Sequence, residues 1–287
     1  MGILAVVNQK GGVGKTTVAL GLASAAMMRG RRSLVVDMDP QANATTGLGV
    51  FDATTTIDHV LTDDAPGAAG RAVRTSAWEP SVGHAPDLVP SSPRLAQCEH
   101  QLATDPIGAQ DRLRVVLDGV AGRYDDVIVD CPPSLGLLTV NALFAADRVL
   151  IVAEPAAWSL DGVEQILRNV RRIADRQDGR PAVAGIVVNR LGRTRDAGYW
   201  YDQLKETHGD LLLEPAIAMR AAVAEAAAQS LPIHLLRRDG ASEAGDQFAA
   251  LARTLDQDRS APAVSSLPQP RIDLSAVVGT SSAPAEH

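Results

Sequence analysis

Lysine, glycine and threonine are concentrated in one short stretch near the start of the chain, residues 8–17, with the sequence NQKGGVGKTT. Glycines let backbone N–H groups turn toward an anion, and the N-terminus of a following helix adds a favourable field. A lysine before two threonines supplies a charge for phosphate oxygens and a hydroxyl for Mg²⁺. The stretch therefore predicts a phosphate-binding loop, whose ligand contacts come from Gly11, Gly12, Val13, Gly14, Lys15, Thr16 and Thr17.

The loop departs from the strict pattern G-x-x-x-x-G-K-[ST], because Gln9 stands where that pattern has its first glycine. A second lysine, Lys10, precedes the glycines and can approach the same polyphosphate from another direction. The chain has three lysines, Lys10, Lys15 and Lys205, so two of the three lie in this loop. A flexible ammonium group suits a crowded triphosphate differently from a planar guanidinium. An ordinary glycine-rich turn is the alternative, and the strand-loop-helix context disfavours it.

Carboxylates follow two further apolar runs. Asp37 and Asp39 come after the run at residues 33–36 and lie two positions apart in an extended segment, so they face the same way. One or both can hold a metal's water or orient an attacking water, whereas two solvated turn carboxylates are the alternative. Asp130 ends the run at residues 126–129 and precedes two prolines, which indicates a carboxylate that binds Mg²⁺ through water.

Short apolar runs alternate with helix-compatible segments along most of the chain. Expected strands cover residues 3–7, 33–36, 87–89, 126–129, 148–153, 182–188 and 211–213. Expected helices cover residues 18–28, 54–61, 93–103, 109–121, 160–176, 197–207, 220–230 and 241–255. This order predicts an α/β fold over residues 1–255, with a doubly wound, mostly parallel sheet flanked by helices. Residues 63–83 lack a clear period and predict an irregular loop.

Composition is that of a globular protein with one large domain. The chain has 287 residues, of which 46% are apolar and 21% charged, while aromatics reach only 3%, so the core must be aliphatic. Residues 256–287, rich in Ser, Pro and Ala, predict a disordered tail. Cys98 and Cys131 lie far apart, which favours buried, reduced thiols over a disulfide framework or a metal cluster.

Charge and hydropathy limit the cellular locations and the binding partners that we expect for the protein. No basic leader precedes an apolar stretch, and no run approaches the roughly 20 apolar residues of a membrane span, so we expect a cytoplasmic protein. The net charge of −7 argues against an entirely positive surface. A local basic face remains compatible with that sum, because binding to phosphate backbones depends on the distribution of charge.

Arginines gather on the expected helix at residues 160–176, on the side opposite its apolar residues. This face is a candidate contact for a phosphate backbone, and a solvated face is an equal alternative. Asn189 ends a strand, and its amide can donate and accept as reading an adenine edge requires. The candidate DNA-binding residues are Arg168, Arg171, Arg172, Arg190, Arg193, Arg195 and Arg220.

The motif at residues 10–17, KGGVGKTT, resembles the deviant Walker A loop of the ParA/MinD superfamily of dimerising P-loop ATPases, with Lys10 as its signature lysine. The two acidic segments resemble the later signatures of that family. The resemblance implies catalysis by Lys10, Lys15 and Asp39, with Lys10 reaching the nucleotide of the partner subunit in a sandwich homodimer. It further implies that ATP is the nucleotide, that Thr16, Asp37 and Asp130 hold Mg²⁺, and that Asn189 and the turn at Pro215 contact the base.

Within that superfamily, the sequence is most similar to ParA/Soj-type ATPases of chromosome or plasmid partition. Such proteins bind nonspecific double-stranded DNA as ATP dimers, are stimulated by a ParB-like protein with a basic peptide, and associate with the nucleoid. The segment 218–222 departs from the pattern, because Arg220 is its only arginine. The alternatives are an ATPase that positions a non-DNA cargo, a MinD-like regulator, an ATP-dependent carboxylase or amidoligase, and a noncatalytic scaffold. The tail lacks a basic amphipathic helix, which disfavours membrane anchoring.

Overall fold

A single mixed sheet runs through the molecule. The computed structural model describes residues 2–257 apart from 81–82, 106 and 158. Within these residues, eight strands pair in the order β3-β4-β2-β5-β1-β6-β7-β8. The strands are β1 (Ile3–Val7), β2 (Ser33–Asp37), β3 (Arg74–Thr75), β4 (Asp87–Val89), β5 (Asp126–Asp130), β6 (Arg148–Ala153), β7 (Ala182–Val188) and β8 (Leu212–Leu213).

All neighbouring strands are parallel except β3, which pairs antiparallel with β4 at the edge. The central strand β1 alternates its side chains between two cores, with Ala5 and Val7 on one face and Leu4 and Val6 on the other. Burial on both faces explains why the strands appear in the sequence as continuous apolar runs. Because the strands are parallel, their carboxyl ends meet at one edge, where ligands bind in such sheets.

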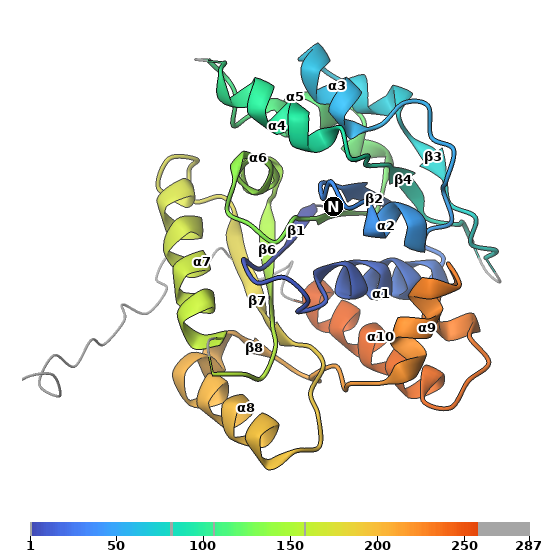
Figure 1. The fold of residues 1–287 in the computed structure, drawn as a ribbon, viewed down its shortest axis with the longest axis vertical. Helices are drawn as coiled ribbons and strands as arrows, with labels where there is room; N and C mark the ends of the chain where they lie inside the picture. Colours follow the sequence, from blue (N-terminus) through green and yellow to red (C-terminus); the bar gives the residue numbers. More distant parts are fainter. Residues whose placement is uncertain (1, 81–82, 106, 158, 258–287) are drawn as a thin grey trace, which may run out of the picture.

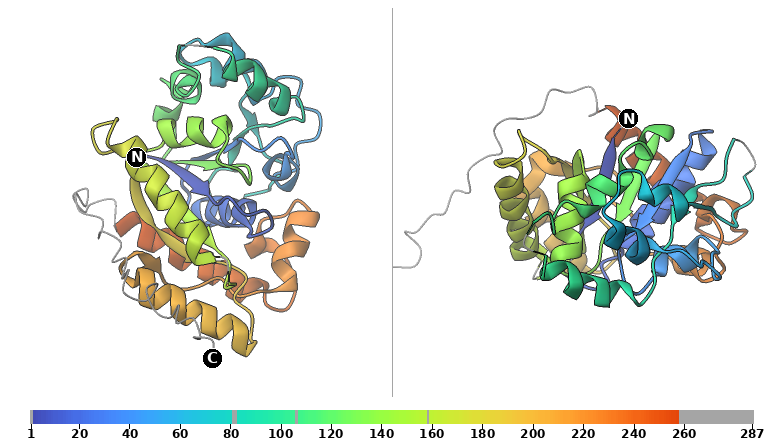
Figure 2. Two further views of the ribbon diagram at one scale, coloured as in Figure 1. Left: turned by 60° about the vertical axis from the view of Figure 1, so that its left-hand side comes forward. Right: turned by 90° about the horizontal axis from the view of Figure 1, so that it is seen from above.

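Helices cover both faces of the sheet (Figure 1, Figure 2). One face carries α1 (Lys15–Met28), α2 (Asn43–Gly47), α9 (Ala221–Ala228) and α10 (Ala241–Gln257). The other carries α3 (Ile57–Asp63), α4 (Leu95–Ala103), α5 (Arg112–Leu117), α6 (Leu137–Ala145) and α7 (Ser159–Ala174). Helix α8 (Arg195–His208) lies at the β8 end of the sheet. Short 3-10 turns are η1 (Ala68–Arg71), η2 (Ala121–Arg123), η3 (Gly209–Leu211) and η4 (Ile233–Leu235).

The doubly wound fold predicted from the sequence is confirmed, with specific corrections. Residues 63–83 are not entirely irregular, because they contain η1 and the edge strand β3. The helix predicted at residues 109–121 is split into α5 and η2, since Gly119 adopts a positive φ of 69° that ends a helix. Two helices, α2 and α6, are absent from the prediction; α2 is short, and α6 is apolar on nearly all sides, so it shows no helical period.

The last helix, α10, ends at Gln257, two residues beyond the predicted domain boundary. The predicted disordered tail, apart from residues 256–257, lies outside the described residues. None of the described helices is both long and apolar enough to span a membrane.

Close packing of α1 against α10 predicts that a side chain at Gly21 would strongly destabilise the fold. A Cβ there would lie 2.3 Å from Cδ1 of Phe248, a fully buried ring. We expect Gly21→Ala to lower the free energy of unfolding by about 1–3 kcal/mol in urea denaturation. Gly162→Ala in α7 is the control, because a Cβ there meets nothing within 4 Å; it should raise stability by about 0.5–1 kcal/mol. Equal stabilities of the two variants would contradict this packing.

Candidate functional site

The glycine-rich loop connects β1 to α1 at the carboxyl edge of the sheet. Gly12 and Gly14 adopt positive φ values of 81° and 88°, which glycine reaches without strain. Gly14 caps α1, a helix of 14 residues whose first turn contains no acidic residue. The unpaired N–H groups and the partial positive charge of the helix end are therefore available to an anion, as the sequence predicts.

The side chain of Lys15 is buried beside this loop. Its relative exposure is 6%, and Nζ donates a hydrogen bond to the carbonyl oxygen of Lys10 at 3.4 Å. Burial lowers the pKa of Lys15, and the charges of Asp130 and Asp39 oppose that shift. A buried ammonium group whose protein partner is a single long contact to a carbonyl is well placed to take phosphate oxygens.

Thr16 and Asp130 meet below the loop, where Thr16 Oγ1 donates to Asp130 Oδ2 at 2.7 Å. Asp130 is fully buried, and its Oδ1 has no hydrogen-bond partner among the residues that the structure describes. Burial raises the pKa of Asp130, and Asp37 adds to this, while Thr16 and Lys15 act in the opposite direction.

A buried carboxylate oxygen without a partner is costly, and a cation beside it would remove that cost. The pair fits Mg²⁺, which keeps several waters and usually takes one or two protein carboxylates. Within the described part of the chain, no group of three or more His, Cys, Asp or Glu residues is arranged for a metal. Thr16 and Asp130 are therefore the residues that would hold Mg²⁺ together with nucleotide phosphates.

Asp37 supports the backbone around it. Its Oδ1 accepts from the N–H of Asp39 at 3.1 Å, and its Oδ2 accepts from the N–H and Oγ1 of Thr45 at 2.8 and 2.7 Å. Burial raises the pKa of Asp37 to about 6, against these hydrogen bonds. Both oxygens have protein donors, so the carboxylate shapes the segment from β2 to α2. Its predicted place in a magnesium shell stays a prediction.

Asp39, the predicted water-orienting residue, is held from two sides. Its Oδ1 accepts from the N–H of Gln41 at 2.9 Å, and its carbonyl oxygen accepts from Ser91 Oγ at 2.7 Å. The N–H of Ser91 in turn donates to Thr45 Oγ1 at 2.9 Å. The serine after β4 therefore fixes the acidic segment, a role that its sequence position did not reveal.

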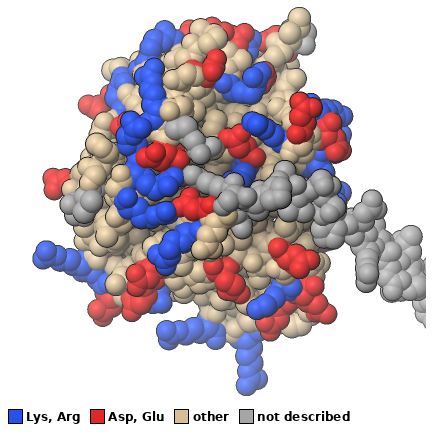
Figure 3. Space-filling model, turned by 180° about the vertical axis from the view of Figure 1, so that it is seen from behind, with Lys and Arg blue, Asp and Glu red and all other residues tan. Residues whose placement is uncertain are grey.

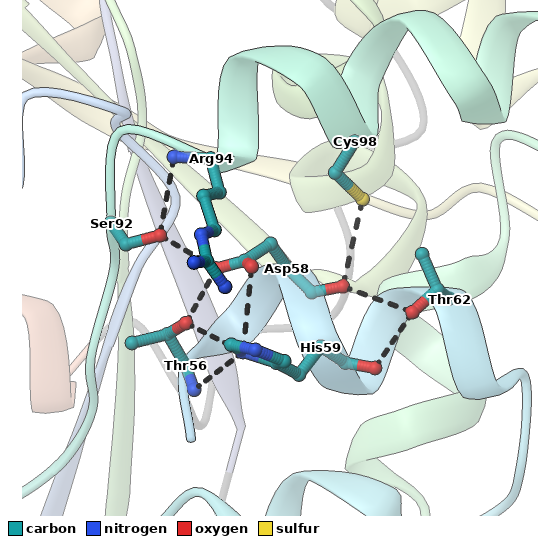
Figure 4. A network of polar contacts seen from close by, with 7 residues as sticks. All are labelled: Thr56, Asp58, His59, Thr62, Ser92, Arg94 and Cys98. Atoms are coloured by element: carbon teal, nitrogen blue, oxygen red, sulfur yellow. Dashed lines mark hydrogen bonds and ion pairs between the residues drawn. The ribbon is translucent and has the colours of Figure 1, made fainter. Parts of the chain in front are cut away.

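A polar network continues from the next residue, Ser92, into α3 and α4 (Figure 4). Ser92 Oγ donates to Asp58 Oδ1 at 2.9 Å, and Thr56 Oγ1 donates to the same oxygen at 2.5 Å. His59 closes the cap of α3 by accepting from the N–H of Thr56 at 3.2 Å. Cys98 of α4, buried as predicted, points its thiol at the carbonyl oxygen of Asp58. The support of the acidic segment is thus anchored in two helices.

Asn189 and Arg190 contact the loop from the end of β7. Asn189 is buried, and its Nδ2 donates to the carbonyl oxygen of Val13 at 2.8 Å. Nη1 of Arg190 donates to the carbonyl oxygen of Gly12 at 2.7 Å. A Cβ on Gly14 would lie 2.1 Å from Asn189 Nδ2, so only glycine fits there. The predicted roles of Asn189 toward a base and of Arg190 toward DNA stay predictions.

The side chain of Lys10 lies at the surface, unlike the buried side chain of Lys15. Its Nζ is 3.8 Å from Glu154 Oε2, and 48% of its side chain is exposed. Its N–H donates to Asn8 Oδ1 at 2.8 Å, and Asn8 Nδ2 donates to the carbonyl oxygen of Val152 at 2.5 Å. The backbone of Lys10 is therefore fixed to β6 while its ammonium group faces outward.

The remaining candidate residues come from several elements. On α7, Arg168 pairs with Glu164 at 3.3 Å, and Arg172 is exposed. Arg193 and Arg195 are exposed where α8 begins. Arg220 precedes α9, and its buried Nε makes no hydrogen bond within the described part of the chain. Two more of the predicted site residues are Arg171, which is partly buried, and Pro215, which follows a cis peptide bond.

Comparisons with known proteins agree with this geometry. A family model described as an AAA domain matches residues 1–181. The sporulation initiation inhibitor protein Soj of Bacillus subtilis is 34% identical over 88% of this chain and 96% of its own length. The chromosome partitioning protein ParA of Caulobacter vibrioides is 34% identical over 91% of this chain and 97% of its own. A solved structure of cobyrinic acid a,c-diamide synthase from Mycobacterium smegmatis, with bound ATP analogue and magnesium, has a TM-score of 0.73 at 28% identity and covers 91% of this chain and 97% of that one.

Because the buried carboxylate of Asp37 accepts from the hydroxyl of Thr45, loss of that hydroxyl should lower stability. We expect Thr45→Val to lower the free energy of unfolding by about 1.5–3 kcal/mol, because a charged buried acceptor loses its hydroxyl donor. Thr46→Val is the control, since that hydroxyl is exposed and donates to carbonyls of its own helix; its effect should stay within about 0.5 kcal/mol. Urea denaturation measures both, and a loss confined to Thr46→Val would refute the assignment.

Proposed function

The chain belongs to the ParA and Soj family of P-loop ATPases, and from this premise we propose that it is an Mg²⁺-dependent ATPase that dimerises on ATP and acts in chromosome or plasmid partition. The observation that carries the proposal is the pair of Thr16 and Asp130 beneath a glycine loop that also holds the buried Lys15. A nucleoside triphosphate with its metal would give the free oxygen of Asp130 a cation and the ammonium group of Lys15 phosphate acceptors.

Each residue of the site has a distinct part in hydrolysis. The loop amides and Lys15 bind the phosphates, Thr16 and Asp130 hold the metal, and Asp39 orients the attacking water. When bound, Mg²⁺ neutralises charge that develops on the phosphates. Asp39 is suited to its part because its backbone is fixed by Ser91, whereas Asp37 is engaged with Thr45.

Dimerisation is supported by the position of Lys10. Its side chain is half exposed, and its contact with Glu154 is a long ion pair at the surface, which contributes about 0–1 kcal/mol. A weak pair of this kind leaves Lys10 free to reach the phosphates of a second subunit. We therefore propose a sandwich homodimer in which each Lys10 serves the partner's nucleotide.

Binding of nonspecific double-stranded DNA by the ATP dimer, at the nucleoid in the cytoplasm, completes the proposal. Seen from behind, Lys and Arg side chains form a run along one side and are mixed with Asp and Glu elsewhere (Figure 3). This mixture fits a chain with a net charge of −7 that carries local basic surfaces. The acidic remainder would attract a ParB-like partner that offers a basic peptide and stimulates hydrolysis.

An amidoligase is the second candidate, favoured by the likeness to a diamide synthase. The partition relatives favour the first function, because they match this chain at higher identity over 96% and 97% of their own lengths. ATP turnover without any added amine or acid substrate would distinguish an ATPase from an amidoligase.

Substitutions of Lys15 and Asp39 should impair different steps of the reaction. Lys15→Gln should weaken ATP binding about 10- to 100-fold, because it removes a charge-assisted contact with the phosphates. Asp39→Ala should keep ATP binding, slow phosphate release by about 10²-fold and trap the dimer. Fluorescence titration, light scattering and phosphate release measure these three effects. Asp52→Ala, an exposed carboxylate outside the site, is the control. A normal turnover rate in the Asp39 variant would refute its role.

The arginines at the start of α8 should govern DNA retention. Arg193→Gln and Arg195→Gln should each weaken ATP-dependent DNA binding and reduce the slope of log K against log salt by about 0.9 per lost phosphate contact. Binding measured between low and physiological salt gives the slope. Arg253→Gln, an exposed arginine of α10, should leave it unchanged. If the unmodified protein showed no ATP-dependent DNA binding at low salt, a non-DNA cargo or a MinD-like role would replace partition.

A further inference from the structure

Two consecutive residues after β7 bind two consecutive carbonyls of the phosphate loop. Arg190 Nη1 donates to the carbonyl oxygen of Gly12, and Asn189 Nδ2 donates to that of Val13. In a planar trans peptide, the C=O and the next N–H point in opposite directions. Holding these carbonyls toward the end of β7 therefore turns the N–H groups of Val13 and Gly14 away from it.

The backbone of Arg190 is itself forced into position. Its φ is 57°, in the left-handed region that residues other than glycine rarely adopt. Neighbouring backbone bonds maintain it: Asn189 N–H donates to Ala153 O at 2.8 Å, and Leu191 N–H donates to Ile217 O at 3.0 Å. Such a conformation persists where the surrounding structure fixes it, and these positions cluster at ligand sites.

Asn189 and Arg190 differ in what a variant can reveal. Asn189 is buried and is also the predicted base contact, so its loss would disturb several functions together. Arg190 is exposed, and the hydrogen bond to Gly12 is its contact with the loop. A change at Arg190 therefore isolates the orientation of the peptide between Gly12 and Val13.

We propose that Arg190 is a positioning residue of the nucleotide site, which fixes the Gly12–Val13 peptide so that its N–H faces the β- and γ-phosphates of the bound nucleotide. The inference rests on the proposed binding of ATP at this loop. It assigns the effect of Arg190 to the polyphosphate part of the ligand, and it separates Arg190 from Arg193 and Arg195, whose proposed contact is with DNA.

Competition binding tests the assignment. A fluorescent ATP analogue is titrated onto the full chain in Mg²⁺ without DNA, and ATP or inorganic pyrophosphate then displaces it. Arg190→Gln should weaken the binding of ATP about three- to tenfold, the range of a typical intramolecular hydrogen bond, and should weaken the binding of pyrophosphate by the same factor. Arg190→Lys should restore part of the affinity, because it keeps the charge and loses the planar fork. Arg253→Gln is the control.

Arg190→Gly keeps the test decisive if other variants fold poorly, because glycine adopts the positive φ without strain. This variant should melt at or above the temperature of the unmodified protein and still lose affinity for pyrophosphate. Unchanged affinity for ATP in both the Gln and Gly variants would overturn the inference alone. A loss for ATP but not for pyrophosphate would assign Arg190 to the base and also overturn it. Failure of the unmodified protein to bind ATP would overturn the proposed function itself.

Discussion

The parallel pairing of β5 with β1 and β2 fixes where the carboxylates of the site lie. In this register Asp130 stands opposite both Val6 and Asp37, at the carboxyl ends of the strands. A slip by one residue would turn the Asp130 side chain to the opposite face of the sheet, away from Thr16. Apolar burial on both faces enforces the register, so the packing of the core also places the carboxylate that we propose for the metal.

The site separates charges that the protein satisfies from charges that it leaves for a ligand. Asp37 accepts three hydrogen bonds from its own chain, and these make it a rigid support. Asp130 retains an unpartnered oxygen, and Lys15 has one long contact to a carbonyl. In a buried environment the desolvation of such unpaired groups lowers the stability of the ligand-free protein. A metal and a polyphosphate bound here would remove that destabilisation.

Local patterns predicted every strand except the two-residue edge strand β3, together with the loop glycines and the acidic strand ends, because each of these depends on residues close in sequence. The same patterns could not reveal the bond between Asn189 and Val13, which joins positions 176 residues apart. Helix α6 was missed because it is buried on nearly every side, which removes the periodicity that marks a helix. Ser91 gave no signal either, since a serine after a strand is ordinary and only the fold brings it to Asp39.

The turn after β7 links these separate supports into one unit. On one side, Asn189 and Arg190 hold the phosphate loop; on the other, Leu191 pairs with Ala218, and Met219 N–H donates to the carbonyl of Leu191 at 3.0 Å. The segment that leads to Arg220 is therefore connected to the loop by an unbroken series of hydrogen bonds. The phosphate loop and the segment that leads to Arg220 are thus joined through the same short turn.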